Sequence, residues 1–287
     1  MLRRLIAVIA VAAVMQAPAR AEPPPDPVRA AYEASMEGRK ADTLAAVQEL
    51  AAKRSIERVL TVGGSGWELT PQYSALVRFG LWDEMIAVTP PNAHALGLTA
   101  GYLYARGVAL AARGRLAEAR QALADLERLD AGTPAGRGDD RDGLHDLIAI
   151  AVPVVAARIA ATELRNGDAI AELGKAAAAE DRLSANEGTG WFFPVRHLLG
   201  AQLLIAGRPA EAERVYREDL ERHPGDGWAL YGLVGALRAQ GRRAAAAATE
   251  REFTRAWEHA DLRLLSSAFW FAGPDTTSCE CQRQAAY

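Results

Sequence analysis

A sequence pattern that recurs six times constrains the fold of this chain more than any other feature. Each copy has an apolar stretch, a glycine, a short polar step and an alanine-rich amphipathic stretch. A glycine readily adopts the left-handed conformation that ends one helix before a tight turn into the next. The pattern therefore predicts six helical hairpins. Their expected turn glycines are Gly38, Gly80, Gly114, Gly167, Gly207 and Gly241.

The stretch that follows each glycine has the periodicity of a helix with one apolar face. In the third copy, Leu116, Ala119 and Leu123 recur at intervals of three and four residues. One hairpin cannot bury such a stripe alone, whereas stacked hairpins can. We therefore expect an all-α chain, a right-handed α-solenoid of about six hairpins over residues 22–265. Residues 266–287 are expected to form an irregular tail.

The copies resemble the tetratricopeptide repeat (TPR) family over residues 27 to about 265, and two of them match it best. In one copy, the residues at family spacing are Gly200, Leu204, Gly207, Ala212, Tyr216 and Pro224. In the other copy they are Leu103, Gly107, Leu110, Gly114 and Ala119. The run Trp-Phe-Phe-Pro-Val-Arg-His at residues 191–197 is also similar to a stretch in secreted bacterial TPR proteins of unassigned activity. The resemblance implies a scaffold fold and no reaction.

The N-terminus has the features of a cleaved signal peptide. Arg3 and Arg4 precede an uninterrupted apolar run, residues 5–15, and a small-x-small pattern follows at residues 19–21. The apolar run is shorter than the ~20 residues that a membrane-spanning helix needs. We therefore expect residues 1–21 to be removed and the mature protein to be periplasmic or secreted, with no integral membrane segment.

The charge of the chain bears on the class of its partner. The formal net charge is -3, and removal of residues 1–21 takes away three arginines and no acidic residue. The mature chain is therefore more acidic than the full one, and is a poor electrostatic match for nucleic acid or anionic lipid. We expect a protein or peptide partner, and the oligomeric state stays open.

The sequence contains no motif that predicts catalysis or a resident cofactor. Its five histidines are dispersed, without metal-binding spacing, and no Gly-x-Ser-x-Gly elbow is present. The glycine-rich run at residues 63–66 lacks the Lys-Ser/Thr pair of a phosphate-binding loop. We therefore expect a protein that is not an enzyme and that holds no cofactor.

Aromatic, arginine and histidine side chains on the first helix of each hairpin are the candidate partner-binding residues. The TPR resemblance implies that these helices line a concave groove, and aromatic and arginine residues carry most of the energy of protein interfaces. We expect His197, Trp228 and Tyr231 to share one patch, although such rings also pack between helices. The full set is Trp67, Arg78, Tyr104, Arg165, His197, Trp228, Tyr231 and Arg238.

The pair Cys279 and Cys281 supports an alternative function. Both cysteines lie in the expected tail of a chain that is sent to an oxidising compartment. A Cys-x-Cys bridge closes a very small, strained and reducible ring, and two thiolates at this spacing also suit a soft metal such as Cu(I). A thiol-redox or metal-handling protein is therefore the alternative, and an idle tail disulfide is the simplest explanation of the motif.

Overall fold

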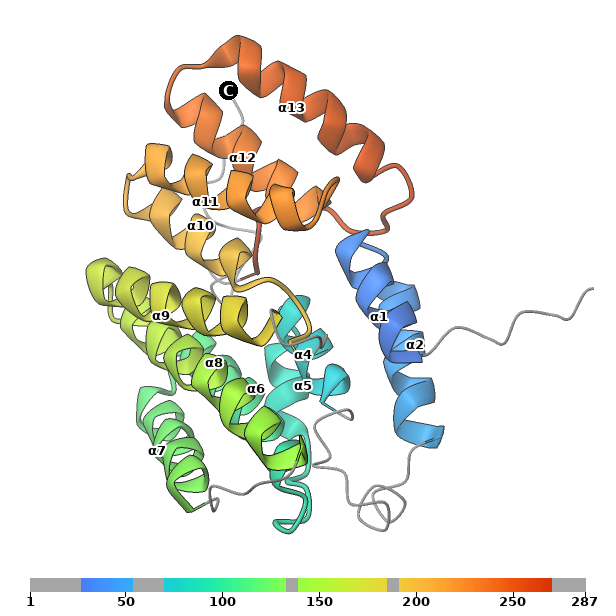
Figure 1. The fold of residues 1–287 in the computed structure, drawn as a ribbon, viewed down its shortest axis with the longest axis vertical. Helices are drawn as coiled ribbons and strands as arrows, with labels where there is room; N and C mark the ends of the chain where they lie inside the picture. The colour runs from blue at the N-terminus through green and yellow to red at the C-terminus, as the bar shows by residue number, and fades with distance from the viewer. Residues whose placement is uncertain (1–26, 54–69, 133–138, 185–190, 270–287) are drawn as a thin grey trace, which may run out of the picture.

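The computed structural model describes residues 27–53, 70–132, 139–184 and 191–269, and all regular secondary structure in these ranges is helical (Figure 1). The prediction of an all-α fold is confirmed. The helices are α1 (Pro27–Met36), α2 (Lys40–Lys53), α4 (Pro71–Arg78), α5 (Trp82–Ala87), α6 (Leu96–Ala112), α7 (Leu116–Gly132), α8 (Asp139–Thr162), α9 (Asn166–Ser184), α10 (Val195–Ile205), α11 (Pro209–Arg222), α12 (Gly227–Ala239) and α13 (Arg243–Ala256).

Consecutive helices form pairs, and each pair packs against the next. The pairs are α1–α2, α4–α5, α6–α7, α8–α9, α10–α11 and α12–α13. Helix α4 also contacts α2 and α6, α6 contacts α8, and α10 contacts both α9 and α12. In Figure 1, α12–α13 lies above α10–α11, which lies above α8–α9.

A residue in the left-handed region ends the first helix of each pair. Five of the six expected turn glycines have positive φ angles. The expectation for Gly167 is wrong, because Leu164 takes this position with φ 61°. Its amide donates to Ala161 O over 3.0 Å, and the next amide donates to Ala160 O over 2.9 Å. Gly114 and the residue after it form the same pair of bonds.

A small residue five positions after the turn identifies the register of the α8–α9 pair. Ala119 and Ala212 follow their turn residues at this distance, and both are fully buried. Ala169 follows Leu164 at the same distance and is fully buried as well. Counting from Gly167 instead gives the partly exposed Glu172, which pairs with Lys175. The repeat is therefore intact, and its turn lies three residues earlier than the glycine suggested.

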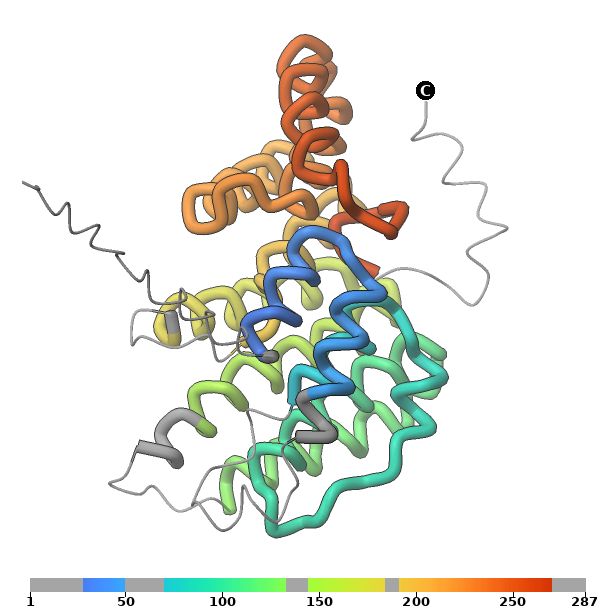
Figure 2. The backbone as a smooth tube through the Cα atoms, turned by 90° about the vertical axis from the view of Figure 1, so that its right-hand side faces the viewer, coloured from blue at the N-terminus to red at the C-terminus, as the bar shows by residue number. Residues whose placement is uncertain are grey.

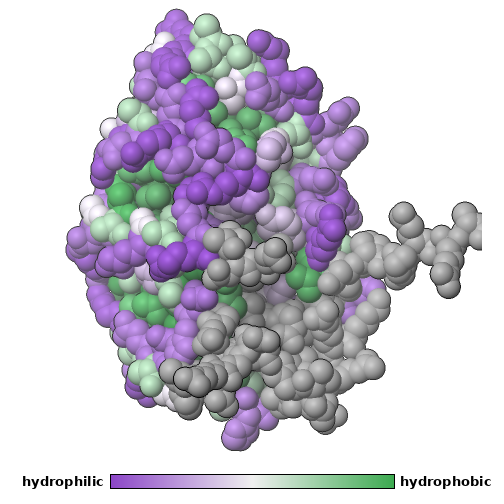
Figure 3. All heavy atoms as spheres, in the orientation of Figure 1, coloured by the Kyte–Doolittle hydropathy of each residue, from purple (hydrophilic) through white to green (hydrophobic). Residues whose placement is uncertain are grey.

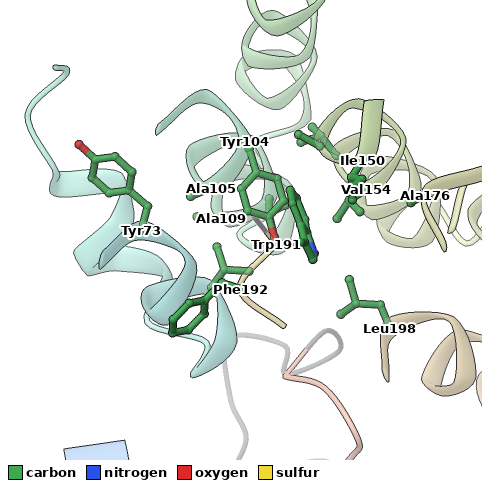
Figure 4. Packing of buried hydrophobic residues seen from close by; sticks show 14 of the residues in the cluster. Tyr73, Tyr104, Ala105, Ala109, Ile150, Val154, Ala176, Trp191, Phe192 and Leu198 are labelled. Atoms are coloured by element: carbon green, nitrogen blue, oxygen red, sulfur yellow. The ribbon is translucent and has the colours of Figure 1, made fainter. Parts of the chain in front are cut away.

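Alanine and glycine let the helices in the middle of the molecule approach closely. A Cβ atom added at Gly107 of α6 would lie 2.9 Å from Val155 Cγ1 of α8. Figure 4 shows Tyr104 of α6 beside Trp191, with Ile150 and Val154 of α8 next to them, and the two ring centroids are 5.0 Å apart. These side chains form the main hydrophobic core of the described residues.

Helix α8 contains the one stretch of the described residues that is long and apolar enough to cross a membrane. This stretch, residues 144–162, has a mean hydropathy of 1.8, and 72% of it is buried inside the structure. It contacts α6, α7 and α9. A central core helix has these properties, and in this structure α8 occupies that place.

The first and the last helix pairs also touch each other, although most of the chain lies between them. Trp228 Nε1 of α12 donates a hydrogen bond to Ser35 O of α1 over 3.0 Å. The ring of Trp257 lies so close to Gly38 and Gly227 that an added Cβ at either glycine would be 2.2 Å from it. No repeat or motif of the sequence indicates this closure between the two ends of the helical region.

A non-helical stretch follows α13 and runs back toward the beginning of the chain (Figure 2). We call residues 261–269 the returning segment. The carboxylate of Asp261 accepts hydrogen bonds from the backbone amides of Lys40 and Ala41, at 2.7 and 2.9 Å, and so caps the N-terminus of α2. The indole of Trp257 donates to Leu262 O over 2.8 Å. The segment is therefore anchored to the first helix pair at its beginning.

Candidate functional site

Three of the expected partner-binding residues meet where α4, α10 and α12 converge. The guanidinium carbon of Arg78 lies 3.8 Å from the centroid of Trp228, and Arg78 Nη1 lies 2.9 Å from His197 Nδ1. Arg78 is the last residue of α4, while His197 and Trp228 lie in the first turns of their helices. The structure therefore brings His197 and Trp228 together, as their sequence spacing suggested.

These residues do not lie on an open face, and that part of the expectation is corrected. Arg78, Tyr104, His197 and Trp228 have exposed fractions of only 3%, 1%, 0% and 0%. Tyr104 packs against Trp191 in the main core. The other three are enclosed because the first helix pair and the returning segment cover them.

The remaining expected residues are placed elsewhere. Tyr231 belongs to the hydrophobic cluster of Trp228, but its half-buried ring packs on Phe253 with a centroid distance of 5.4 Å. Arg165 and Arg238 are exposed and form ion pairs within their own helix pairs, with Glu163 and Asp168 and with Glu250. The predictions for Trp67, Cys279 and Cys281 fall outside the described residues, as do those for residues 1–21.

Arg78 is a buried cation held between aromatic rings. Its guanidinium carbon lies 5.0 Å from the centroid of Phe193, in addition to its contact with Trp228. Burial lowers the pKa of Arg78 to about 10, although Asp226 acts in the opposite direction. This value is above neutral pH, so Arg78 stays charged. A buried cation requires compensating anions nearby.

Two buried carboxylates supply this compensation through His197. His197 Nε2 lies 3.1 Å from Asp219 Oδ2 of α11 and 2.8 Å from Asp226 Oδ2. The other oxygen of Asp226 accepts from the amide of Trp228 over 2.8 Å and caps the N-terminus of α12. We call Arg78, His197, Asp219 and Asp226 the polar centre.

Opposing effects set the proton affinities in the polar centre. Burial lowers the pKa of His197, but Asp226 and Asp219 outweigh it and raise the pKa to about 9. Burial raises the pKa of Asp219, yet His197 and His223 hold it below its usual range. His223 Nδ1 lies 3.2 Å from Asp219 Oδ1, so the carboxylate has two histidine neighbours. The carboxylates therefore favour a positive ring at His197.

The contact with Arg78 favours the opposite state of His197. An arginine N–H is always a donor, so Nδ1 accepts from it only when the ring is neutral and its proton is on Nε2. In that state Nε2–H donates to Asp219, while Asp226 Oδ2 has no hydrogen-bond partner. When the ring is positive, Nδ1 carries a proton and the contact with Arg78 is no longer a hydrogen bond. Protonation of His197 therefore strengthens its attraction to Asp219 and Asp226 and removes the hydrogen bond from Arg78.

The imidazole and the two carboxylates are also close enough to hold a cation. One ligand atom each from His197, Asp219 and Asp226 lie within 4.8 Å of one another. A metal on Nε2 would leave the proton on Nδ1, facing the N–H of Arg78 at 2.9 Å. A metal-ligating histidine normally donates from its second nitrogen to an acceptor. The donor that faces Nδ1 therefore disfavours a metal ion on Nε2.

The returning segment covers the polar centre with its second half. Ser267 Oγ donates to the backbone oxygen of His197 over 3.0 Å, and the hydroxyl of Tyr216 lies 2.6 Å from the same Oγ. The ring of Phe269 meets the ring of Trp228 edge-on, with a centroid distance of 5.9 Å. We call Phe79, His197, Tyr216 and Trp228 the docking face.

Side chains, and not backbone ladders, hold the segment on this face. Leu264, Ser267 and Ala268 have exposed fractions of 5%, 2% and 5%, whereas Leu265 is 41% exposed. Within the described parts of the chain, residues 261–269 form no backbone–backbone hydrogen bond. The segment therefore binds as an extended peptide ligand would, through separate contacts of its individual side chains.

Several residues of this site were missed in the sequence analysis. Asp226 had a usable signal, because an aspartate directly before an apolar helical stretch is a typical N-cap. Asp219, Asp261 and Ser267 had none. Asp261 binds amides that lie 220 and 221 residues earlier, and Ser267 binds a carbonyl 70 residues earlier.

Comparisons with known proteins add no relative from which a function could be inferred. No family model, curated protein or solved structure matches this chain. The case for a function therefore depends on the residues and the geometry described above.

Proposed function

We propose that this protein is an exported, non-catalytic scaffold of the TPR type that binds an extended segment of a partner protein. In this proposal the helix pairs form a right-handed α-solenoid, and the docking face belongs to its concave groove. One observation carries the proposal: the chain's own returning segment lies on residues that the sequence pattern assigns to partner binding. A surface that holds one non-helical segment by its side chains is suited to hold another.

The chemistry of the docking face supports binding of a peptide. Phe79 and Trp228 supply aromatic area, and Tyr216 and the carbonyl of His197 supply a donor and an acceptor. Buried aromatic residues surrounded by water-excluding neighbours are typical of the energetic centres of protein interfaces. The guanidinium of Arg78 packs on the ring of Trp228 and helps to hold this ring in position.

The enclosure of the polar centre supports a role without catalysis. His197, Asp219 and Asp226 are almost completely buried. A small space beside Arg78 is lined by apolar side chains, among them Val77, Trp82, Leu198, Ala268 and Phe269. With the returning segment in place the imidazole of His197 is fully buried, and the centre acts as an internal cross-link between helix pairs.

The returning segment competes with the partner in this proposal. A tethered segment has an effective concentration of the order of millimolar, so a partner peptide must exceed this competition or meet a protein whose segment has left. Weakening the segment should therefore increase partner capture. The signal-like features of residues 1–21 support the proposal that this event occurs in the periplasm or outside the cell.

Photo-crosslinking in periplasmic extract tests the proposal. A benzophenone side chain is placed at Leu81, at the edge of the cluster that contains Phe79 and Trp228, in a Phe269→Ala background. The same group at Leu164, on the exposed α8–α9 turn, is the matched control. We expect a crosslinked protein from position 81 that is absent from position 164, and less of it when Phe269 is intact. Equal crosslinking from both positions, or from neither, would contradict the proposal.

A further inference from the structure

The returning segment also indicates which peptides the docking face accepts. We propose that the face recognises an uncharged partner peptide with the pattern apolar-x-x-hydroxyl-small-aromatic, of which Leu264 to Phe269 are an internal copy. This inference rests on the proposed function and names the class of its ligand. Each position of the pattern corresponds to a contact in the structure.

The first position requires an apolar side chain. Leu264 is buried in a cluster with Phe79 and Trp228, and the partly buried Leu81 and Phe253 pack against the same cluster. A charged or polar side chain here would lose its water without gaining a partner. Leu265 follows and is largely exposed, so the next position is free to vary.

The fourth position requires a hydroxyl group. Ser267 Oγ is enclosed by one donor and one acceptor, because it donates to His197 O and therefore receives the hydrogen bond of Tyr216. Only serine and threonine can both donate and accept through a single short side chain. An apolar residue would leave the buried Tyr216 hydroxyl without its acceptor, which is unfavourable inside a protein.

The fifth and sixth positions distinguish a small residue from an aromatic one. Ala268 is buried and, together with Val77, Trp82 and Leu198, lines a small space, so a small side chain fits at this position. Phe269 packs on Trp228, and its Cβ would be 3.2 Å from a Cβ added at Gly80. The α4–α5 turn therefore needs glycine both for its φ of 67° and for the approach of this aromatic residue.

The charge of the polar centre favours a neutral ligand. Arg78 faces His197, Asp219 and Asp226, so its charge is already compensated within the protein. A further buried charge from the ligand would be unpaired and strongly unfavourable. The only charged residues of the returning segment are Asp261, which caps α2, and Arg263, which is exposed.

Fluorescence anisotropy with a labelled synthetic peptide tests this ligand class. The peptide has the sequence of residues 264–269, and the receptor is the full mature chain, either wild type or with Phe269→Ala or Ser267→Val. We expect both variants to bind the peptide at least about tenfold more tightly than wild type, because their own segment competes less well. Receptor Leu265→Ala changes an exposed side chain and should bind the peptide as wild type does.

Changes in the peptide complete the experiment. Replacing the serine that corresponds to Ser267 by valine, or the final phenylalanine by alanine, should weaken binding by about tenfold or more, the loss expected for one buried hydrogen bond or ring contact. Replacing the exposed leucine should not. If neither receptor variant binds the peptide while both melt cooperatively, or if all peptides bind equally, the pattern is wrong.

The outcome separates this inference from the proposed function. A partner crosslinked at position 81 that excess peptide fails to displace would overturn the pattern and leave the scaffold function standing. Peptide binding without any crosslinked partner would overturn the scaffold function. A dimer of the chain that the peptide dissociates would place a second copy in the docking face, and would overturn the assignment to a partner protein.

Discussion

The helix pairs α6–α9 and the region where the first and last pairs meet are built from different interactions. In α6–α9 many of the contacts join neighbouring helices through small and aliphatic side chains, such as Gly107 against Val155. At the closure, a buried arginine, a histidine and two aspartates meet aromatic rings, and the residues that touch are up to 221 positions apart.

The two regions should therefore respond differently to substitution. Loss of a methyl group between apolar helices removes contact area and leaves the rest of the packing in place. Loss of one member of the polar centre leaves a buried charge without its counterion, and this is far more unfavourable than the pair itself is favourable. The closure is thus the more specific part of the fold and the more vulnerable one.

Removal of the Asp226 carboxylate should have the largest effect. Asp226→Ala leaves His197 and Arg78 with one counterion fewer and removes the N-cap of α12, so we expect unfolding to become easier by about 3–5 kcal/mol. Urea denaturation measures this change. Asp168→Ala, which breaks an exposed ion pair, is the control and should have a far smaller effect. Similar losses in the two variants would remove the distinction between the regions.

Truncation of Trp257 should open the closure and spare the middle. Trp257→Ala removes a ring that fills the space at Gly38 and Gly227 and donates to the returning segment, and we expect a loss of about 3 kcal/mol. Amide hydrogen exchange should accelerate in α1 and α2 while α6 and α8 keep their protection. Uniform acceleration over all helices would show that the two regions unfold as one unit.

The pH dependence of stability above pH 6.5 should come from His197 at the closure. The pKa of His197 is raised from 6.5 to about 9 in the folded protein, because Asp226 and Asp219 outweigh burial. The protonated His197 ring therefore contributes at most about 3 kcal/mol to the free energy of unfolding. This contribution is complete below pH 6.5 and is lost as the pH rises toward 9. Arg78, Glu180, Asp219, Asp226 and His223 face this group or act on it.

A variant without the imidazole gives the matching measurement. His197→Gln should unfold more easily at pH 6 and show a flatter stability curve between pH 6.5 and 9. Burial also raises the pKa of Glu180 to about 7, so the folded protein holds this proton more tightly than the unfolded chain does. The stability of both wild type and variant should therefore fall as the pH rises from 4.5 to 7. If the curves of both proteins are parallel up to pH 9, His197 does not titrate in that range.

The smallest effect is expected at a turn of the middle region. Leu164 adopts the left-handed conformation with an exposed fraction of 84%, so its side chain gains little from packing. Leu164→Gly should stabilise the protein by about 0.5–1 kcal/mol, since relief of a penalty of roughly 1–2 kcal/mol exceeds the entropy that glycine adds to the unfolded chain. Gly114→Ala, at the equivalent turn, should do the reverse. Thermal melting of both variants checks the pair.

The helix pairs could be predicted from the sequence because their signals are local. A turn residue, a small residue five positions later and an apolar stripe all lie within one pair, as Gly114, Ala119 and Leu126 illustrate. The error at Gly167 has the same origin. Gly167 lies close to the turn and was therefore predicted to form it. The left-handed turn residue is instead Leu164, and the buried Ala169, five positions later, identifies the register.

The site was predicted only in part because residue type does not determine exposure. A tryptophan, an arginine and a histidine at one point of a helical array suit an open binding face and a closed interior equally well. The difference is made by Ser267, Phe269 and Asp261, which reach the site from outside the repeat pattern. No periodicity relates these residues to Arg78 or Trp228.

The cap that Asp261 places on α2 has a consequence for the order in which the molecule is made. The amides of Lys40 and Ala41 leave the ribosome first, and the carboxylate that satisfies them follows 220 residues later. At a synthesis rate of ~5–20 residues per second, the first helix pair waits roughly 10–45 s for its last contacts. A chain that is truncated anywhere before Asp261 therefore lacks the carboxylate that caps the N-terminus of α2.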